Sequence, residues 1–260
     1  MALSFIATMD VGESSEPAAP KPWQIARVEA VERILSDSTR RIGRMLDVGV
    51  ADGYTGERLC KRLATSFYVA YDARSSDAEC AKRSHAGLRF VNVLPPAARD
   101  FDLVLVRDAL EHTADDGALL REVRARVHTR GRVLVFVPAF EALFSDYDRN
   151  LGRYRRYSLE ALCETMNSLG LPVKSSGYLF GSVLAPRALR RASDVVKALL
   201  PGKRERSGER RAAALQNSVV HRLATSALSV ESSAILSLNA RGMRVPGITA
   251  WLLSDLFEAR

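Results

Sequence analysis

The sequence predicts an α/β fold built on a doubly wound, mostly parallel sheet. Two observations lead to this class. Five short apolar runs alternate with helical patterns between residues 44 and 138. Each run is apolar throughout rather than at every second position, which is typical of strands that helices cover on both faces. The chain has 260 residues, which is enough for one such domain with an added element.

Spacing and chain breakers locate the elements of this region. Ile25, Val28 and Val31 keep helical spacing, so a helix precedes the first strand. A turn with small residues at 49–53 separates that strand from a second helix. The predicted strands span residues 45–48, 67–71, 88–93, 101–106 and 133–137, and the predicted helices span 23–35, 57–64, 75–84 and 115–128, with a turn at Arg130–Gly131 before the fifth strand.

Beyond Pro138 the chain leaves this alternation of strands and helices. Residues 140–157 are rich in aromatic and charged side chains. Ser158 suits the N-cap of a helix that Gly170 closes, because a hydroxyl can accept from the first free amides and glycine tolerates the left-handed end. Residues 171–180 then form a sixth strand.

A helical insertion is predicted between the sixth strand and a last strand at 248–253. The last strand would pair with the sixth and complete a seven-stranded sheet. The chain then divides into a flexible arm, a sheet domain and the insertion, which are residues 1–22, residues 23–181 with 245–260, and residues 182–244. The insertion carries a basic block at 203–211, and we expect it to act as a substrate cap or an interface.

Composition limits the classes of function and the location. The formal net charge is +8 and the pI is near 9.7, which favours an anionic partner. The three cysteines, Cys60, Cys80 and Cys163, are scattered without metal-ligand spacing, so we expect a reduced, cytoplasmic protein without a bound metal. No run approaches the roughly 18 apolar residues of a membrane span, and residues 1–10 lack the features of a signal peptide.

Small and polar residues follow the predicted strands where each strand ends. Gly49 and Gly53 lie in the turn after the first strand, Asp72 follows the second, and Asn92 ends the third. Residues 107–112 follow the fourth. Because the carboxyl ends of parallel strands meet at one rim, ligands of such sheets bind there. An acidic residue at the position of Asp72 can accept hydrogen bonds from both ribose hydroxyls, so this rim predicts a nucleoside cofactor.

Four stretches add signatures to the strand pattern. They are Leu46-Asp47-Val48-Gly49-Val50-Ala51-Asp52-Gly53, the acidic Asp72, Phe101-Asp102-Leu103-Val104 with Asp108-Ala109-Leu110-Glu111-His112, and Arg130-Gly131-Arg132-Val133-Leu134-Val135. In this order they resemble the motifs of class I S-adenosylmethionine-dependent methyltransferases. The resemblance covers about residues 23–180 and implies a Rossmann-like methyltransferase fold with S-adenosylmethionine as cofactor. A nicotinamide dinucleotide would need Gly-x-Gly-x-x-Gly, whereas Gly49, Gly53 and Gly56 are spaced differently.

The resemblance also implies how the rim would hold this cofactor. Gly49 and Gly53 would let backbone approach its amino-acid part, and Ala51 stands in the same turn where the family has its middle glycine. Asp47 would support the turn or bind the ammonium group, and Asp72 would hold the ribose. The remaining contacts would be made by Asn92 and Val93 to the adenine and by Arg107 or Asp108 near the methionine moiety. Two plainer alternatives stay open: Asp47 only caps the turn, and Asn92 only ends a strand.

Methyl transfer from a sulfonium mainly requires that the nucleophile be aligned and, for a hydroxyl, deprotonated. His112 is the candidate base because its ordinary pKa is near neutrality and it lies on the rim. The alternative is that Glu111 and His112 only pack and hydrogen-bond the loop. Tyr147 and Arg153 are further catalytic candidates, from the run at 146–157. That run resembles a region of certain small-molecule and lipid-linked-saccharide methyltransferases that ends in Tyr-Arg-Arg-Tyr, although Arg153 replaces a frequent histidine.

The leading hypothesis is methylation of an O- or N-nucleophile on a small molecule, in a biosynthetic pathway. The arginines of the 146–157 run suit an anionic acceptor, or they form a solvated, salt-bridged loop. RNA methylation is an alternative suggested by the basic block, but no base-methylating motif accompanies it, so we expect no nucleic-acid partner. A catalytically inactive cofactor- or partner-binding module is another. Apolar positions of the insertion leave open a homodimer or peripheral contact with a membrane surface.

Overall fold

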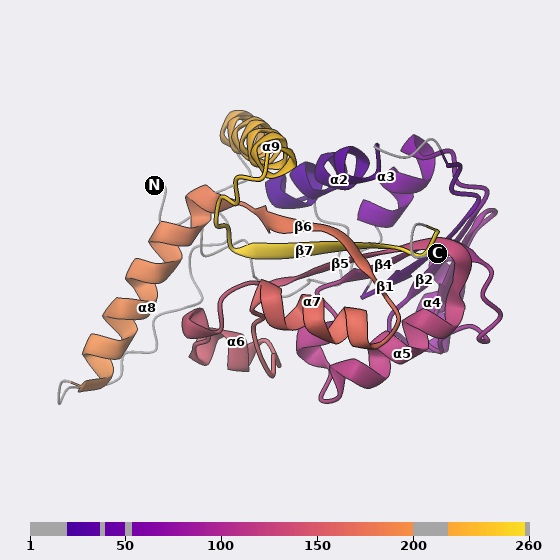
Figure 1. The fold of residues 1–260 in the computed structure, drawn as a ribbon, viewed down its shortest axis with the longest axis horizontal. Helices are drawn as coiled ribbons and strands as arrows, with labels where there is room; N and C mark the ends of the chain where they lie inside the picture. The colour runs from indigo at the N-terminus through magenta and orange to yellow at the C-terminus, as the bar shows by residue number, and fades with distance from the viewer. Residues whose placement is uncertain (1–19, 37–39, 50–53, 200–217, 258–260) are drawn as a thin grey trace.

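The computed structural model describes residues 20–36, 40–49, 54–199 and 218–257. Its centre is a seven-stranded sheet in the order β3-β2-β1-β4-β5-β7-β6 (Figure 1). The first five strands are parallel, and β7 runs antiparallel to both β5 and β6. The strands are β1 Arg44–Val48, β2 Phe67–Tyr71, β3 Leu88–Val91, β4 Phe101–Arg107, β5 Val127–Pro138, β6 Val173–Leu179 and β7 Thr249–Asp255. The predicted fold class is confirmed, including the pairing of the last strand with the sixth.

Helices cover both faces of this sheet (Figure 1). The helices are α2 Pro22–Leu35, α3 Tyr54–Arg62, α4 Asp77–Arg83, α5 Asp116–Arg126, α6 Asp146–Asn150, α7 Leu159–Ser168, α8 Leu184–Leu199 and α9 Ser218–Ala240, with short 3-10 turns η1 Leu110–His112, η2 Glu141–Leu143 and η3 Gly181–Val183. Along β4, Leu103 and Leu105 pack into a core with α2 and α3, whereas Val104 and Val106 pack with α5 and α7. This alternation is expected for a strand buried on both faces.

One predicted boundary is wrong in the middle of the sheet. The turn expected at Arg130–Gly131 is strand, because β5 begins at Val127, directly after α5. Val127 pairs with Phe101, and the register with β4 shifts before Leu103 pairs with Arg132. A Cβ on Gly131 would lie 2.9 Å from the Phe101 carbonyl oxygen. Gly131 therefore allows β4 and β5 to approach closely where their register is irregular. The sequence pattern does not distinguish a glycine at such an irregularity from a glycine in a turn.

Smaller shifts affect residues near the rim. Strand β3 ends at Val91, so Asn92 and Val93 follow the strand rather than end it. Helix α3 begins at Tyr54 instead of residue 57. The arm at 1–22 is described only from Pro20, and the basic block at 203–211 lies outside the described residues.

The described part of the insertion consists of α8 and α9, which lie in different places. Helix α9 packs against α2 and β6 as part of one helical layer, as its position beside α2 in Figure 1 shows. Helix α8 extends away from the sheet and meets η2 and η3 near its beginning. Glu231 of α9 accepts hydrogen bonds from the Ser182 amide at 2.5 Å and the Ser182 hydroxyl at 2.8 Å, which joins α9 to the turn η3 that precedes α8. Among the described helices, we find none that is long and apolar enough to cross a membrane.

Candidate active site at the rim of the sheet

The turn after β1 presses against the end of β4. Gly49 has φ +88°, and a Cβ there would lie 2.2 Å from the carbonyl oxygen of Arg107. Its amide donates to the Tyr71 carbonyl over 3.1 Å. Only glycine fits this left-handed, crowded position without strain. Ala51 and Gly53, which are predicted to contact the cofactor in the same turn, lie outside the described residues.

Asp47 is fully buried beneath this turn, and both of its carboxylate oxygens are occupied. Arg107 donates to Oδ1 from Nε at 2.9 Å and to Oδ2 from its terminal nitrogen at 2.7 Å. The Tyr68 hydroxyl donates to Oδ2 over 2.8 Å. Burial would lower the pKa of Arg107, but the charge of Asp47 outweighs it and raises that pKa. These contacts favour a supporting role for Asp47, and they hold the Arg107 guanidinium against that carboxylate.

Tyr68 is a partner that the sequence reasoning missed. Its pKa is raised well above the ordinary value, first by burial and then by the charge of Asp47, so the hydroxyl keeps its proton and donates. A Cβ on Gly56 of α3 would lie 1.7 Å from this hydroxyl. The signal in the sequence was Gly56 itself, because a glycine inside a helix often marks a close approach.

Asp72, Asn92 and Val93 lie where β2 and β3 end. Asp72 Oδ1 accepts from the Arg74 amide at 3.0 Å and from Arg74 Nε at 3.3 Å. The Asn92 amide group donates to Asp77 Oδ1 over 2.7 Å, which ties the end of β3 to the first turn of α4. The Val93 side chain is 73% exposed. Asp72 and Asn92 therefore keep one side-chain oxygen each, Oδ2 and Oδ1, for which we find no hydrogen bond within the described chain.

Asp108 follows β4 at the same rim with φ +49°, an uncommon backbone conformation for a residue other than glycine. Arg27 of α2 forms an ion pair and a hydrogen bond with its carboxylate. Burial opposes the charged form, but Arg27 prevails and lowers the pKa of Asp108 below its ordinary value. The Arg27 guanidinium lies 4.7 Å from the centre of the Trp23 ring. Arg27 is absent from the sequence-based candidates because it belongs to a helix whose pattern indicates only packing.

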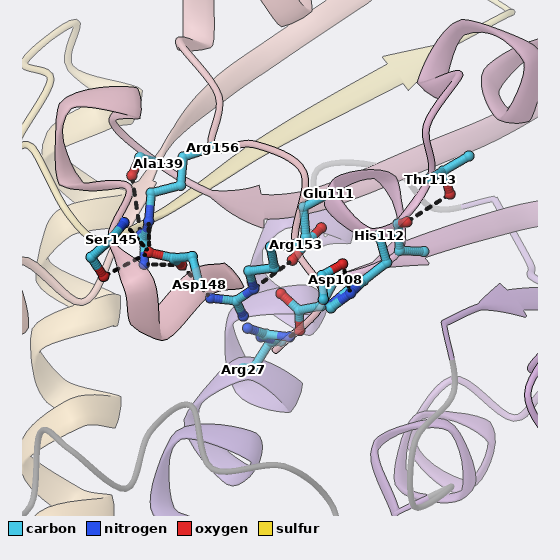
Figure 2. A network of polar contacts seen from close by, with 12 residues as sticks. Arg27, Asp108, Glu111, His112, Thr113, Ala139, Ser145, Asp148, Arg153 and Arg156 are labelled. Carbon is cyan, nitrogen blue, oxygen red and sulfur yellow. Dashed lines mark hydrogen bonds and ion pairs between the residues drawn. The ribbon is translucent and has the colours of Figure 1, made fainter. Parts of the chain in front are cut away.

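Glu111 and His112 form the turn η1 directly after this position (Figure 2). Glu111 is fully buried, and its carboxyl oxygens accept no hydrogen bond from any described residue. Burial, followed by the charge of Asp108, raises the pKa of Glu111 to about 8. His112 Nδ1 lies 3.1 Å from the Gly152 carbonyl oxygen. Because a carbonyl only accepts, Nδ1 carries the proton and Nε2 of the neutral ring is left as an acceptor. Burial and the charge of Arg153 lower the pKa of His112, which keeps the ring neutral at pH 7.

Asp148 organises the segment that contacts His112. It is fully buried, and it accepts from Arg153 at 3.0 Å, from Arg156 at 2.7 and 3.1 Å, and from the Ser145 amide at 3.1 Å. Burial alone would raise the pKa of Asp148, but hydrogen bonds and charge from Arg156 and Arg153 lower it. Figure 2 shows the resulting row of side chains from Arg156 through Asp148 and Arg153 to Glu111.

The other arginines of this run are also paired with carboxylates. Arg155 meets Asp116 at 3.3 Å, and Arg149 meets Asp146 at 2.5 Å. Of the two interpretations of the 146–157 run, these contacts support the salt-bridged loop. Tyr147 lies under the guanidinium of Arg187 from α8, with 4.7 Å between that group and the ring centre. Tyr147 therefore connects the run to the insertion.

The rim thus combines a buried support of charged pairs with a partly exposed edge that carries Asp72, Asn92, Asp108 and His112. These residues follow β2, β3 and β4, at the edge of the sheet where the nucleoside of a cofactor is expected to bind. Among the residues that the structure describes, no group of His, Cys, Asp and Glu side chains is suited to hold a metal ion. The fold is that of a class I S-adenosylmethionine-dependent methyltransferase. A family model described as a methyltransferase domain matches residues 24–176, and the chain belongs to this family.

Solved structures share the fold at low sequence identity. The [4+2]-cyclase SpnF superposes with a TM-score of 0.54 and 17% identity, over 94% of this chain and 86% of its own. Phosphoethanolamine N-methyltransferase 2 of Haemonchus contortus was solved with phosphomonomethylethanolamine and S-adenosylhomocysteine. It superposes with a TM-score of 0.52 and 16% identity, over 90% of this chain and 57% of its own. YcgJ of Bacillus subtilis superposes with a TM-score of 0.51 and 16% identity, over 87% of this chain and 96% of its own. The comparison with curated proteins gives no match.

Proposed function

We propose that this methyltransferase methylates an O- or N-nucleophile on a small molecule, with His112 as the general base. The observation that carries the proposal is the hydrogen bond between His112 Nδ1 and the Gly152 carbonyl. It leaves Nε2 as the proton acceptor on a ring whose pKa is lowered. The H. contortus enzyme of the same fold carries a small phosphorylated amine, which supports this class of acceptor by analogy of fold alone.

The residues present fit S-adenosylmethionine, which when bound supplies a methyl group activated on a sulfonium. Asp72 would accept from the ribose hydroxyls through Oδ2, and Asn92 and Val93 would meet the adenine. Gly49, with Ala51 and Gly53 of the same turn, would receive the amino-acid part. Asp108 would face the methionine moiety, while Asp47 and Arg107 would act from below by supporting the turn.

The reaction places few demands on the chain beyond alignment. Holding the nucleophile in line can contribute roughly 7–11 kcal/mol, and a general base contributes about 10²–10⁴-fold. In our proposal His112 removes a proton from the acceptor. The 145–157 segment and α8 form the wall of the site on the side where the acceptor binds. Tyr147 and Arg153 then serve this wall, because Tyr147 contacts Arg187 of α8 and Arg153 is bound to Asp148.

An anionic acceptor finds less support than a neutral one. The arginines at 149, 153, 155 and 156 are each bound to a carboxylate of the chain, and Arg153 and Arg156 share the one of Asp148. Recruiting one of them would break an existing pair, and for Arg153 and Arg156 that pair is buried. Breaking a buried pair costs about 3–5 kcal/mol. We therefore propose that this wall selects the acceptor by its shape and aligns it, and that it does not recognise a charge on the acceptor.

The two helices of the insertion take different parts in this proposal. Helix α8 would form one side of the acceptor cleft, whereas α9 would belong to the layer over the sheet and present its outer face to a second copy of the chain. The basic block lies outside the described residues, so RNA binding rests on charge alone. Binding of RNA that weakens steeply with salt would favour that alternative.

Calorimetry and a methyl-transfer assay test the proposal in two stages. Wild type is expected to bind S-adenosylmethionine, and Asp72→Ala is expected to weaken binding at least tenfold. Asp100→Ala is the matched control, because Asp100 is an exposed acidic residue that precedes β4 and pairs with Arg44. In assays over small hydroxyl and amine acceptors, His112→Gln should bind the cofactor normally and lose at least about 100-fold in rate. Undiminished transfer by His112→Gln would refute the base, and cofactor binding without transfer to any acceptor would indicate an inactive module.

A further inference from the structure

Residues 152–154 are held against Glu111 and His112 by three adjacent contacts. The Gly152 carbonyl accepts from His112 Nδ1 at 3.1 Å, and the Tyr154 amide donates to the Glu111 carbonyl over 2.7 Å. Between them, Arg153 Nε lies 3.7 Å from Glu111 Oε1. These contacts join the segment after α6 to the turn η1, and they determine which ring nitrogen of His112 carries its proton.

The other end of this connection is Asp148. Its Oδ1 accepts from Arg153 at 3.0 Å, and its backbone carbonyl accepts from the Arg153 amide at 3.0 Å. Arg156 donates to both carboxylate oxygens, and the Ser145 amide and hydroxyl donate to Oδ2. One buried carboxylate therefore ties the start of the segment at Ser145 to its end at Arg156 (Figure 2). Gly152 has φ +74°, a left-handed conformation that glycine adopts without strain.

We infer that Asp148 is a positioning residue for the methyl-transfer site, which acts through Arg153 and Gly152 to hold His112 with its proton on Nδ1. This inference rests on the proposed role of His112 as the base. Asp148 itself touches neither His112 nor the edge where the cofactor is expected. Without its charge, Arg153 and Arg156 would lie buried without their shared partner, and the segment would be expected to move away from η1.

Loss of the contact has a measurable signature on His112. The Gly152 carbonyl selects one neutral tautomer, so a ring released from it would populate the other as well. The charged groups near His112 are Arg153, Arg74 and Asp108, and burial together with Arg153 keeps its pKa below the ordinary 6.5. Withdrawal of residues 152–154 would expose the ring and remove Arg153, and these two effects on the pKa are larger than the opposite effect of losing the Gly152 hydrogen bond. The pKa of His112 would then rise toward 6.5.

Nitrogen-15 NMR of the imidazole rings can test this without a known acceptor. The chain has four histidines, so the His112 signals are assigned by their loss in His112→Gln. Wild type, with S-adenosylmethionine bound, should show the Nδ1-protonated tautomer and a depressed pKa. Asp148→Asn should show a mixture of tautomers and a raised pKa, while the dissociation constant for S-adenosylmethionine stays within about twofold.

Asp146→Asn is the matched control, because Asp146 lies two residues earlier in the same helix and makes an exposed ion pair with Arg149. It should leave the tautomer and the pKa of His112 unchanged. If Asp148→Asn does not fold, Arg153→Gln removes the same link from its other side and should give the same shift. A folded Asp148→Asn or Arg153→Gln with a wild-type tautomer and pKa would overturn the inference. If His112→Gln still transfers methyl groups while Asp148→Asn shifts the tautomer, the role of His112 as the base is refuted, and the inference that Asp148 positions His112 is supported.

Discussion

At the scale of single residues, the rim depends on carboxylates that are held by arginines from distant parts of the chain. Asp47 is held by Arg107, 60 positions away, and Asp108 by Arg27, 81 positions away. Such buried pairs contribute little net stability compared with apolar packing, but losing one partner leaves an uncompensated charge. Glu111 differs, because its carboxyl accepts no hydrogen bond from the described chain.

The raised pKa of Glu111 predicts a pH dependence of stability. The unfolded group titrates near 4.5 and the folded group near 8, so the folded state holds one more proton between these values. Stability from this group is complete below pH 4.5 and is lost as pH rises through 8, with a slope of up to about 1.4 kcal/mol per pH unit. Glu111→Gln mimics the protonated form and should flatten this fall. Urea unfolding at pH 5.5, 7 and 8.5 measures it, and parallel curves for both proteins would contradict the prediction.

Asp47→Asn should be severely destabilising, because it leaves the buried Arg107 without a counter-charge. We expect a loss of about 3 kcal/mol in the free energy of unfolding, measured by urea titration. Asp100→Asn removes an exposed partner of Arg44 and should cost less than about 1 kcal/mol. The double variant Asp47→Asn/Arg107→Met should recover part of the loss. Equal costs for the buried and exposed positions would show that the buried pair matters no more than a surface pair.

At the scale of elements, the contact between α3 and β2 is set by one glycine. Gly56 faces the Tyr68 hydroxyl so closely that a methyl group would overlap it. The strand residue Tyr68 can therefore reach Asp47 only under a helix that has no side chain at this point. The position of α3, which follows the glycine turn, thus depends on the Tyr68–Asp47 hydrogen bond below that turn.

Gly56→Ala should destabilise the protein by roughly 1–3 kcal/mol through overpacking, and by more if the Tyr68–Asp47 hydrogen bond is lost. Gly117→Ala is the matched control in α5, where the nearest atoms to a Cβ lie at 3.4 Å. It should be neutral or stabilise by up to about 1 kcal/mol, because alanine is the better helix former. Thermal and urea unfolding of both variants give the comparison. A Gly56→Ala protein as stable as wild type would mean that Tyr68 can move without cost.

Elements could be predicted from the sequence where burial leaves a strong pattern. Apolar runs such as 101–106 and 67–71 predicted β4 and β2 to within a residue, since a strand covered on both faces must be apolar throughout. The turn predicted at Gly131 was wrong because glycine occurs both in turns and at irregularities of strands, and the sequence alone does not separate the two. The positions of the candidate residues on the rim followed from the topology of the parallel sheet. Their partners Tyr68, Arg27 and Asp148 did not, because side-chain pairing across the fold leaves no periodic signal in one sequence.

At the scale of the whole molecule, the insertion joins the layer over the sheet and adds surface to it. Helix α9 carries few charged residues for its length of 23 residues in a chain of which 26% is charged. Its inner side packs on α2 and β6 through residues such as Leu228 and Ile235. Its outer side presents Val219, Leu223 and Val230 to solvent.

These three side chains are 53%, 66% and 70% exposed, and their spacing places them on one side of the helix. A two-fold axis through these apolar side chains would bury them against their own copies, with the exposed Arg222 at the border of the contact. We therefore expect a homodimer in sedimentation velocity at micromolar concentration. Leu223→Glu/Val230→Glu should convert it to a monomer that keeps the wild-type circular dichroism spectrum, because neither side chain is in the core. Met243→Glu changes an exposed apolar residue beyond the helix and should leave the dimer intact. A wild-type monomer at all concentrations, or a dimer that survives the double substitution, would place no interface on α9.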